Sequence, residues 1–461
     1  DEEGPQSLEQ LQRQVAEEAE AEVPGACAWL AEEGQEALAH ALRGAVLHLR
    51  ACLEATTSTS EAVTPDETMS SLGKLCAEAA VKRLRSDQGW TESWLLLHAF
   101  GRALAAIAEV ADARRAAETA STSAEAVAMQ QPHLQSAMRH VDEAIILGAT
   151  RLRSCVALAR TIDAELRSTR FTADLPFSSH LPEALPSCAR LPPMRPSNAI
   201  ASVDAREMSL ARFRNDHVQR RQPLVMRGLA KEWDSRADLC NLDHLSALCG
   251  HRTVPIEYGS SEADGDGVLN FRRFLQEFIV PSIIVDESES RCSSDGEDAA
   301  PTDEERSCAV AYMSQHSLLE QVPEVQRLVE VPAHVAVLSG RLKSVNAWLG
   351  TRGTVTSAHV DADDNLLVQV GGHKYVRLFA PAEAENLYAA THPRAGKGGG
   401  EASFSPVRVE APDLREHPKF AHAAFEEAVL GPGDAVFIPA GTWHYVRSVS
   451  TSFSVSFWCG E

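Results

Sequence analysis

Residues 349–379 read LGTRGTVTSAHVDADDNLLVQVGGHKYVRLF. In this stretch His359 and Asp361 stand two positions apart, where one strand-like run ends and the next begins. Because the side chains of a strand alternate between its two faces, residues i and i+2 project to the same side. An imidazole and a carboxylate therefore face one pocket, where a divalent metal needs one more ligand. The pair alone is a weak signal, because a surface histidine beside an acidic turn gives the same letters.

The residues after this pair have the pattern of two strands joined by a tight turn. Residues 365–370 and 373–379 are strand-like, and the two glycines between them signal a β-hairpin. In the returning strand, Lys374, Val376 and Leu378 share one face. A lysine among apolar neighbours is costly unless it meets an anion. Its ammonium group therefore either holds the carboxylate of a bound acid near the metal or extends to solvent.

A second segment, GPGDAVFIPAGTWHYV at residues 431–446, places another histidine in a related setting. We expect Ala435–Ile438 to be a short buried strand between two turns, and His444 to begin the next strand. Residues 452–458 alternate as a further strand. In a double-sheet jelly roll, a histidine just after such a turn lies at the mouth, where ligand cavities open. Two histidines and one carboxylate on one face of a metal form the facial triad of non-haem Fe(II) oxygenases.

These two segments, extended to residues 346–381 and 433–458, resemble the Jumonji-C oxygenases, which use Fe(II), 2-oxoglutarate and O2. The resemblance covers residues 202–458 and is looser in the helical region before them. Its nearest match is a member described both as a lysine demethylase and as an arginyl hydroxylase. The implied fold class is α+β, with an N-terminal helical domain followed by a double-stranded β-helix, the cupin-like jelly roll.

Position by position, the resemblance implies roles for particular side chains. The iron ligands would be His359, Asp361 and His444. Lys374 would bind the distal carboxylate of 2-oxoglutarate, and the other residues of that cosubstrate site would be Tyr312, Thr356 and Asn365. The substrate side chain would be enclosed by Glu257, Trp348 and Trp458. The family has serine at the Thr356 position, so the hydroxyl is kept, but Gly-Gly-His-Lys here replaces a Met-Gly-Arg-Lys turn.

The composition fits a two-domain protein with reduced cysteines. The chain has 461 residues, 44% of them hydrophobic, which is enough for a substantial core. Its formal charge of -22 argues against direct nucleic-acid binding and favours basic protein partners. The ten cysteines show no regular spacing and are expected to be reduced, buried thiols of an intracellular protein. No run approaches 18 apolar residues, so we expect no membrane span.

We expect residues 1–167 to form a helical domain for scaffolding or partner binding. A capping box at Ser7 and Gln10 starts the first helix, and apolar stripes at helical spacing follow. They lie in residues 38–53, 72–85, 94–110 and 134–166.

Residues 168–198 hold six prolines, which exclude long helices and predict a linker. The oxygenase domain is then expected at residues 199–461. Within it, residues 286–306 are too rich in Asp, Glu and Ser to be buried, which predicts a disordered surface insertion. Residues 396–400 predict a second flexible insertion.

The expected reaction is hydroxylation of an arginine or lysine side chain in a protein. Trp348 and Trp458 are expected to sandwich a cationic side chain that Glu257 pairs with, unless both tryptophans are ordinary core residues. A planar guanidinium fits such a pocket better than a trimethylated lysine. Histone N-methyl-lysine demethylation by the same chemistry and a non-catalytic binding scaffold are the alternatives. We expect the protein in the nucleus, the cytoplasm or both.

Overall fold

The computed structural model divides the chain into two compact units. One contains residues 1–175 together with His251–Thr253, and the other contains Pro176–Gly250 and Val254–Glu461. The structure describes residues 7–32, 35, 38–40, 42–44, 46–47, 49, 67–84, 92–147, 153–168, 177, 179–187, 189–259, 266–292, 309–389 and 403–461.

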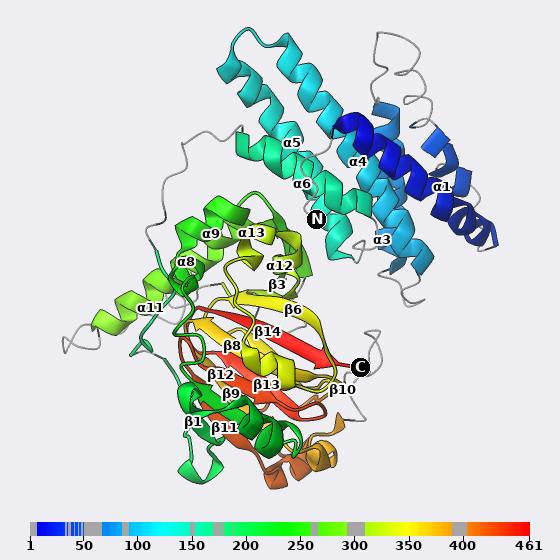
Figure 1. The fold of residues 1–461 in the computed structure, drawn as a ribbon. Coiled ribbons are helices and arrows are strands. Elements are labelled where there is room, and N and C mark those ends of the chain that lie inside the picture. Colours follow the sequence, from blue (N-terminus) through cyan, green and yellow to red (C-terminus); the bar gives the residue numbers. More distant parts are fainter. Residues whose placement is uncertain are drawn as a thin grey trace. The chain divides into compact units, whose positions relative to one another are not determined.

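The first unit is a bundle of helices (Figure 1). Its long helices are α1 (Leu8–Glu32), α3 (Glu67–Leu84), α4 (Glu92–Thr119), α5 (Ser123–Ile146) and α6 (Arg153–Ser168). The alanine-rich helix α4 contacts the other four. It approaches α3 closely at two glycines, since a Cβ atom on Gly73 would lie 2.5 Å from the Gly101 carbonyl oxygen. The predicted helical domain is therefore present, but residues 134–166 form parts of two helices, α5 and α6, rather than one continuous stripe.

Helix α4 has the composition of a membrane-spanning helix but is a core helix. Among the described residues, its part Trp94–Thr119 is long and apolar enough to cross a membrane, yet 78% of its most apolar stretch is buried inside the protein. The apolar side chains of this stretch of α4 contribute to the main hydrophobic core of the helical unit.

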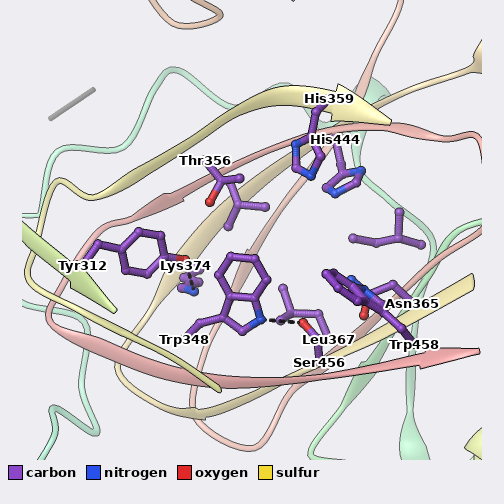
Figure 2. A pocket seen from close by; sticks show the side chains of 12 residues that line it. Tyr312, Trp348, Thr356, His359, Asn365, Leu367, Lys374, His444, Ser456 and Trp458 are labelled. Carbon is purple, nitrogen blue, oxygen red and sulfur yellow. Dashed lines mark hydrogen bonds between the residues drawn. The ribbon is translucent and has the colours of Figure 1, made fainter. Parts of the chain in front are cut away.

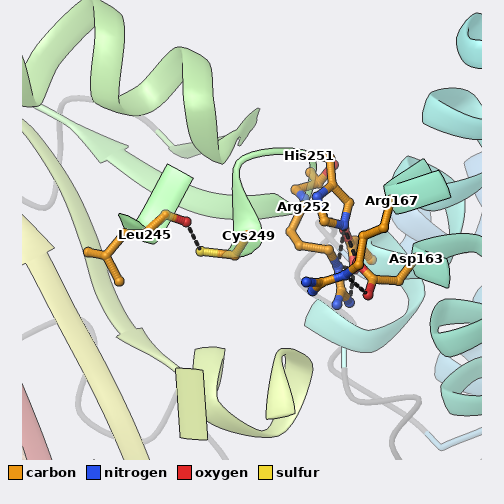
Figure 3. A network of polar contacts seen from close by, with 8 residues as sticks. Asp163, Arg167, Leu245, Cys249, His251 and Arg252 are labelled. Carbon is orange, nitrogen blue, oxygen red and sulfur yellow. Dashed lines mark hydrogen bonds and ion pairs between the residues drawn. The ribbon is translucent and has the colours of Figure 1, made fainter. Parts of the chain in front are cut away.

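A buried ion pair anchors His251–Thr253 in the helical unit. Arg252 and Asp142 are 3% and 0% exposed, and their Nη2 and Oδ1 atoms are 2.6 Å apart. The Thr253 N–H donates to the same carboxylate at 2.7 Å. Next to this pair, the Asp163 carboxylate contacts His251 Nε2 and accepts a hydrogen bond from Arg167 Nε (Figure 3). Removing one partner of such a pair would leave a buried charge uncompensated.

The second unit is a jelly roll of two facing sheets (Figure 1), which confirms the expected fold class. Within the described residues, the larger sheet has the order β1 (Ser202–Asp204), β2 (Leu224–Arg227), β12 (Ala435–Ile438), β8 (Asp364–Gly371), β14 (Ser452–Gly460), β6 (Arg341–Gly350), β5 (Ala311–His316), β3 (Thr253–Tyr258), β4 (Asp266–Asn270). The smaller sheet has the order β10 (Ser403–Phe404), β7 (Val355–Val360), β13 (Trp443–Ser448), β9 (Lys374–Phe379), β11 (Glu426–Leu430).

Short helices accompany the larger sheet. They are α7 (Leu210–Arg212), α8 (Arg236–Cys240), α9 (Leu242–Cys249), α10 (Phe271–Phe274), α11 (Val280–Cys292), α12 (Leu318–Gln321) and α13 (Pro323–Gln326). Single turns of 3-10 or π-helix are η2 (Pro196–Asn198), η3 (Ala205–Glu207), η4 (Phe213–Val218), η5 (Leu275–Ile279), η6 (Ala333–Val337), η7 (Pro381–Glu385) and η9 (Pro418–His422).

Alternation along the strands produces separate apolar clusters. In β9, Val376 and Leu378 join a cluster that also contains residues of the larger sheet, whereas Tyr375 and Phe379 join another cluster with residues of the smaller sheet. The odd-numbered residues of β14, such as Phe453, belong to a third cluster with the helices. The first of these clusters therefore lies between the two sheets, and it is the one that includes cavity-lining side chains.

The expected hairpin at residues 371–372 is wrong. Strand β8 pairs with β12 and β14 in the larger sheet, whereas β9 pairs with β11 and β13 in the smaller one. The two glycines therefore carry the chain from one sheet to the other. Gly372 has φ +71°, and a Cβ atom there would lie 2.0 Å from the Thr451 carbonyl oxygen. A tight turn was correctly located, but the partners of its two strands are distant in sequence.

Two segments expected at the surface are partly packed into the second unit. The described part of residues 177–198 belongs to this unit, and its Leu181 is only 2% exposed. The acidic insertion predicted at residues 286–306 begins within helix α11. Its Asp286 is 2% exposed and pairs with Arg352 Nε at 3.2 Å, so this part of the prediction is wrong. Residues 293–306 and 396–400 lie outside the described residues.

Candidate metal and cosubstrate site

Two neighbouring strands of the smaller sheet bring three possible metal ligands together. His359 lies on β7 and His444 is its cross-strand partner on β13, while Asp361 follows the end of β7. The Asp361 carboxylate oxygens lie 3.8 Å from His359 Nε2 and 3.5 Å from His444 Nε2. The ligand atoms of all three residues lie within 4.8 Å of one another. Figure 2 shows the two imidazoles side by side at one edge of a cavity.

The backbone determines which ring nitrogen of each histidine is available. His359 Nδ1 lies 2.8 Å from the Ser357 carbonyl oxygen, and His444 Nδ1 lies 3.0 Å from that of Thr442. A carbonyl oxygen can only accept a hydrogen bond, so Nδ1 carries the proton in both rings. Both Nε2 atoms therefore present a lone pair toward Asp361, as metal-binding histidines do.

These residues fit a divalent first-row metal ion. Asp361 Oδ2 is buried and has no hydrogen-bond partner in the structure, although it lies 3.5 Å from His444 Nε2. A cation would satisfy that oxygen and both imidazoles at once. Imidazole and carboxylate ligands on one side of the ion suit Fe(II) and leave its other positions open.

A second set of possible ligands, in the helical unit, is already satisfied by protein atoms. Glu109, Asp112 and His133 place ligand atoms within 4.8 Å of one another. However, Glu109 accepts hydrogen bonds from Lys74 at 3.3 Å and Ser136 at 3.0 Å, and its other oxygen lies 2.9 Å from His133 Nδ1. The adjacent Lys74 ammonium opposes a cation, so this cluster is an ion-pair network.

His359 and His444 line a cavity between the sheets (Figure 2). Its empty volume, counted together with the open solvent at its mouth, is about 350 Å³. It is lined by Tyr312, Trp348, Thr356, His359, Asn365, Leu367, Lys374, Ile438, His444, Val446, Ser456 and Trp458. Every residue expected around 2-oxoglutarate thus lines the cavity that the histidines border.

Lys374 lies across the cavity from the histidines, beside Tyr312 (Figure 2). It is 2% exposed, and its ammonium donates a 3.3 Å hydrogen bond to the Tyr312 hydroxyl. It also lies 5.4 Å from the Tyr312 ring centroid and 5.8 Å from that of Trp348. Burial lowers the Lys374 pKa to about 7. The alternative in which this lysine extends to solvent is therefore wrong.

The polar groups near Lys374 are incomplete without a ligand. Among the described residues, no carboxylate forms an ion pair with its ammonium group, and burial is the only cause of its pKa shift. Burial also raises the Tyr312 pKa, against the effect of a hydrogen bond with Thr356. Asn365 Oδ1 is buried without a hydrogen-bond partner. A positive charge and unpaired polar atoms facing one cavity fit a small anionic ligand.

The expected substrate pocket is only partly assembled. Trp348 and Trp458 both line the cavity, but their rings are edge to face, with centroids 6.3 Å apart and planes at 75°. The prediction that they sandwich a planar cation between them is wrong, because a sandwich needs facing rings. Glu257, on β3, is half-buried and lies outside the cavity lining, although its charge helps to raise the Tyr312 pKa.

Several lining residues were missed, although the same alternation would have found them. Ser456 stands two positions before Trp458 and accepts a 2.7 Å hydrogen bond from Trp348 Nε1. Leu367 and Val446 stand two positions after expected site residues of their own strands. The signal was the period of two along each strand. Asp364, which is buried but does not line the cavity, had no comparable signal.

Comparison with known proteins supports this reading of the site. A cupin-like domain model matches residues 210–459, more than half of the chain. The zebrafish protein named Lysine-specific demethylase 8 is 32% identical over 333 residues, which is 70% of this chain and 74% of the relative. The Arabidopsis thaliana protein Lysine-specific demethylase JMJ30 is 33% identical over 251 residues, covering 54% and 53% of the two chains.

Drosophila melanogaster has a similar protein, named Jumonji C domain-containing protein 5. It is 29% identical over 282 residues, covering 59% of this chain and 63% of the relative. The matches thus span between about half and three quarters of these relatives. Their names agree with the triad and cavity of the second unit, and the family implies dependence on Fe(II) and 2-oxoglutarate. The chain therefore belongs to the cupin-like Jumonji-C family of oxygenases.

Proposed function

We propose that this protein is a dioxygenase that hydroxylates arginine or lysine side chains of a basic protein substrate. The observation that carries the proposal is one cavity lined at one edge by His359 and His444, which lie close to Asp361, and at the other by the buried ammonium of Lys374. When bound, Fe(II), 2-oxoglutarate and O2 supply the oxidation, while the protein supplies orientation and charge.

The residues of the chain then have separable tasks. Lys374 binds the distal carboxylate of 2-oxoglutarate as a point charge, and the Tyr312 and Thr356 hydroxyls and the Asn365 amide complete that site. The two histidines and Asp361 hold the metal through Nε2 and carboxylate oxygen atoms. The apolar side chains of Ile438 and Val446 limit the entry of water.

The substrate class is proposed from charge and from the relatives. The formal charge of -22 favours a basic partner. The two tryptophans offer aromatic surface to a cationic side chain, and the buried Trp458 Nε1 has no hydrogen-bond partner. The names of the zebrafish and Arabidopsis relatives favour N-methyl-lysine demethylation as the second candidate. Such a substrate would be met in the nucleus or the cytoplasm.

The direct test is succinate formation with Fe(II), 2-oxoglutarate, O2 and Lys/Arg-rich peptides. We expect turnover by the intact chain, none by His359→Ala, and normal turnover by the control His422→Ala, whose histidine is exposed and outside the cavity. Mass spectrometry then separates the candidates, because hydroxylation adds one oxygen and demethylation removes methyl groups. If neither the intact chain nor His359→Ala forms succinate with any of the peptides, a binding scaffold is favoured.

A further inference from the structure

The turn before His444 is held by hydrogen bonds that it donates to the segment that contains Asp361. The Gly441 N–H donates to the Asp361 carbonyl oxygen at 2.8 Å, and the Ala440 N–H donates to Asp364 Oδ1 at 2.9 Å. Gly441 has φ +76°, a conformation that glycine adopts at little cost. The turn before His444 is therefore joined to the segment that contains Asp361.

Asp364 is the side chain in this junction. It is the first residue of β8 and is only 5% exposed. Its second oxygen, Oδ2, accepts a 3.1 Å hydrogen bond from the Ser339 N–H. One buried carboxylate thus receives backbone N–H groups from two segments far away in sequence. Hydrogen bonds to an ionised acceptor are shorter and stronger than those between neutral groups.

We propose that Asp364 is a positioning residue for the metal centre. It holds Ala440, and through the short turn it holds the Thr442 carbonyl oxygen, which accepts the hydrogen bond from His444 Nδ1. That bond fixes the plane of the imidazole and leaves Nε2 pointing at Asp361. Asp364 touches neither the ligand atoms nor the cavity lining, so its effect on the metal is indirect.

The chemistry of Asp364 predicts how substitutions differ. In Asp364→Asn one oxygen still accepts, but the amide NH2 faces a backbone N–H, and one of the two hydrogen bonds is lost. In Asp364→Ala both buried N–H groups lose their side-chain acceptor. The neighbour Asp363 is a matched control, because its carboxylate is partly exposed and binds Lys343 Nζ at 2.9 Å. Asp363→Asn removes the same charge one position away.

The experiment measures Mn(II) binding to the metal-free protein, and thermal unfolding of the same samples. We expect Asp364→Asn to weaken Mn(II) affinity about 10-fold and Asp364→Ala to weaken it more, within the range of about 10 to 100-fold for outer-shell partners. Asp363→Asn should bind Mn(II) as the intact chain does. The NMR signal of His444 Nδ1–H should shift in the Asp364 variants, which loss of global stability alone does not produce.

The inference rests on the metal part of the proposed function, and the outcomes separate the two. If the intact chain binds no Mn(II), both are overturned. If it binds Mn(II) and Asp364→Asn binds equally well, the role of Asp364 is overturned while the metal centre stands. Should Asp364→Ala fail to fold, Asp364→Asn decides, because it has nearly the same shape. A lower melting temperature with unchanged Mn(II) affinity likewise contradicts the inference.

Discussion

At the scale of single residues, Lys374 has an unusual environment for a charge. It is buried against two aromatic rings, and its hydrogen bond to Tyr312 does not neutralise it. Such a charge is costly in the free protein and is offset only when an anion binds. The free-energy cost of burying the Lys374 charge is therefore offset when a dicarboxylate binds at this position.

The affinity for 2-oxoglutarate should fall as the pH rises above 7. Burial lowers the Lys374 pKa to about 7, whereas a bound carboxylate favours the ammonium form and raises that pKa. Above pH 7 binding must therefore take up a proton, and the affinity should fall by up to about tenfold per pH unit. Titration of the Mn(II)-loaded protein with 2-oxoglutarate from pH 6.5 to 9 measures this. An affinity that does not change with pH would contradict the assigned role.

Lys374→Met should increase stability and abolish cosubstrate binding. Burial lowers the Lys374 pKa from 10.5 to about 7 in the folded protein, so the unfolded chain binds the ammonium proton more tightly. The buried charge therefore lowers the free energy of unfolding by its full amount below pH 7. This loss of stability diminishes as the pH rises toward 10.5. Replacing the buried charge by an apolar side chain should therefore stabilise the metal-free protein at pH 6.5, by about 1–4 kcal/mol. Urea unfolding measures this, with the exposed Lys419→Met as control; a destabilised Lys374→Met would count against the idea.

At the scale of elements, the crossing between β8 and β9 determines where Lys374 lies. The crossing is possible because Gly372 adopts a positive φ and packs directly against the backbone of Thr451. Lys374 starts the next strand two residues later and faces the space between the sheets. A hairpin at the same place would have kept both strands in one sheet.

Gly372→Ala should destabilise the protein more than Gly353→Ala. Both glycines have positive φ, at +71° and +89°, so each substitution carries a backbone cost of about 1 kcal/mol. A Cβ atom at Gly372 would also lie 2.0 Å from the Thr451 carbonyl oxygen, whereas one at Gly353 meets only Val310 Cγ2 at 3.7 Å. We expect a loss of about 3 kcal/mol or more for Gly372→Ala, from strain added to the backbone cost. Equal unfolding free energies for the two variants would show that the crossing tolerates a side chain.

At the scale of the whole molecule, each unit contains a buried ion pair. Arg252 pairs with Asp142 in the helical unit and Arg377 with Glu427 in the oxygenase unit, where the buried Lys374 ammonium also faces a cavity. The described cysteines 27, 76, 155, 240, 249 and 459 are buried and form no disulfide with one another. The work of the helical unit remains the prediction made from the sequence, scaffolding or partner binding.

Asp142→Ala should weaken the helical unit strongly. The change leaves the Arg252 guanidinium, 3% exposed, without its carboxylate, and breaking a buried pair costs about 3–5 kcal/mol. Circular dichroism of urea unfolding measures the loss. The control Asp112→Ala removes a carboxylate that is 33% exposed and pairs with Arg115 on the same bundle, and it should have little effect. A similar loss for both variants would contradict the importance of burial.

The sequence alone determined the chemistry of the site and most of the strands that carry it. His359, Asp361, His444 and Lys374 were found because strand alternation and turn residues are local signals. The other residues of the cosubstrate site, Tyr312, Thr356 and Asn365, came from the resemblance to the Jumonji-C oxygenases. The tertiary structure decided what depends on distant partners. It decided that the Gly371–Gly372 turn joins two sheets and that Asp286 is buried. It also decided that the two tryptophans meet edge to face and that Asp364 accepts a hydrogen bond from the turn before His444. Strand pairing and burial depend on contacts between residues that are far apart in the chain, and those contacts form only when the whole domain folds.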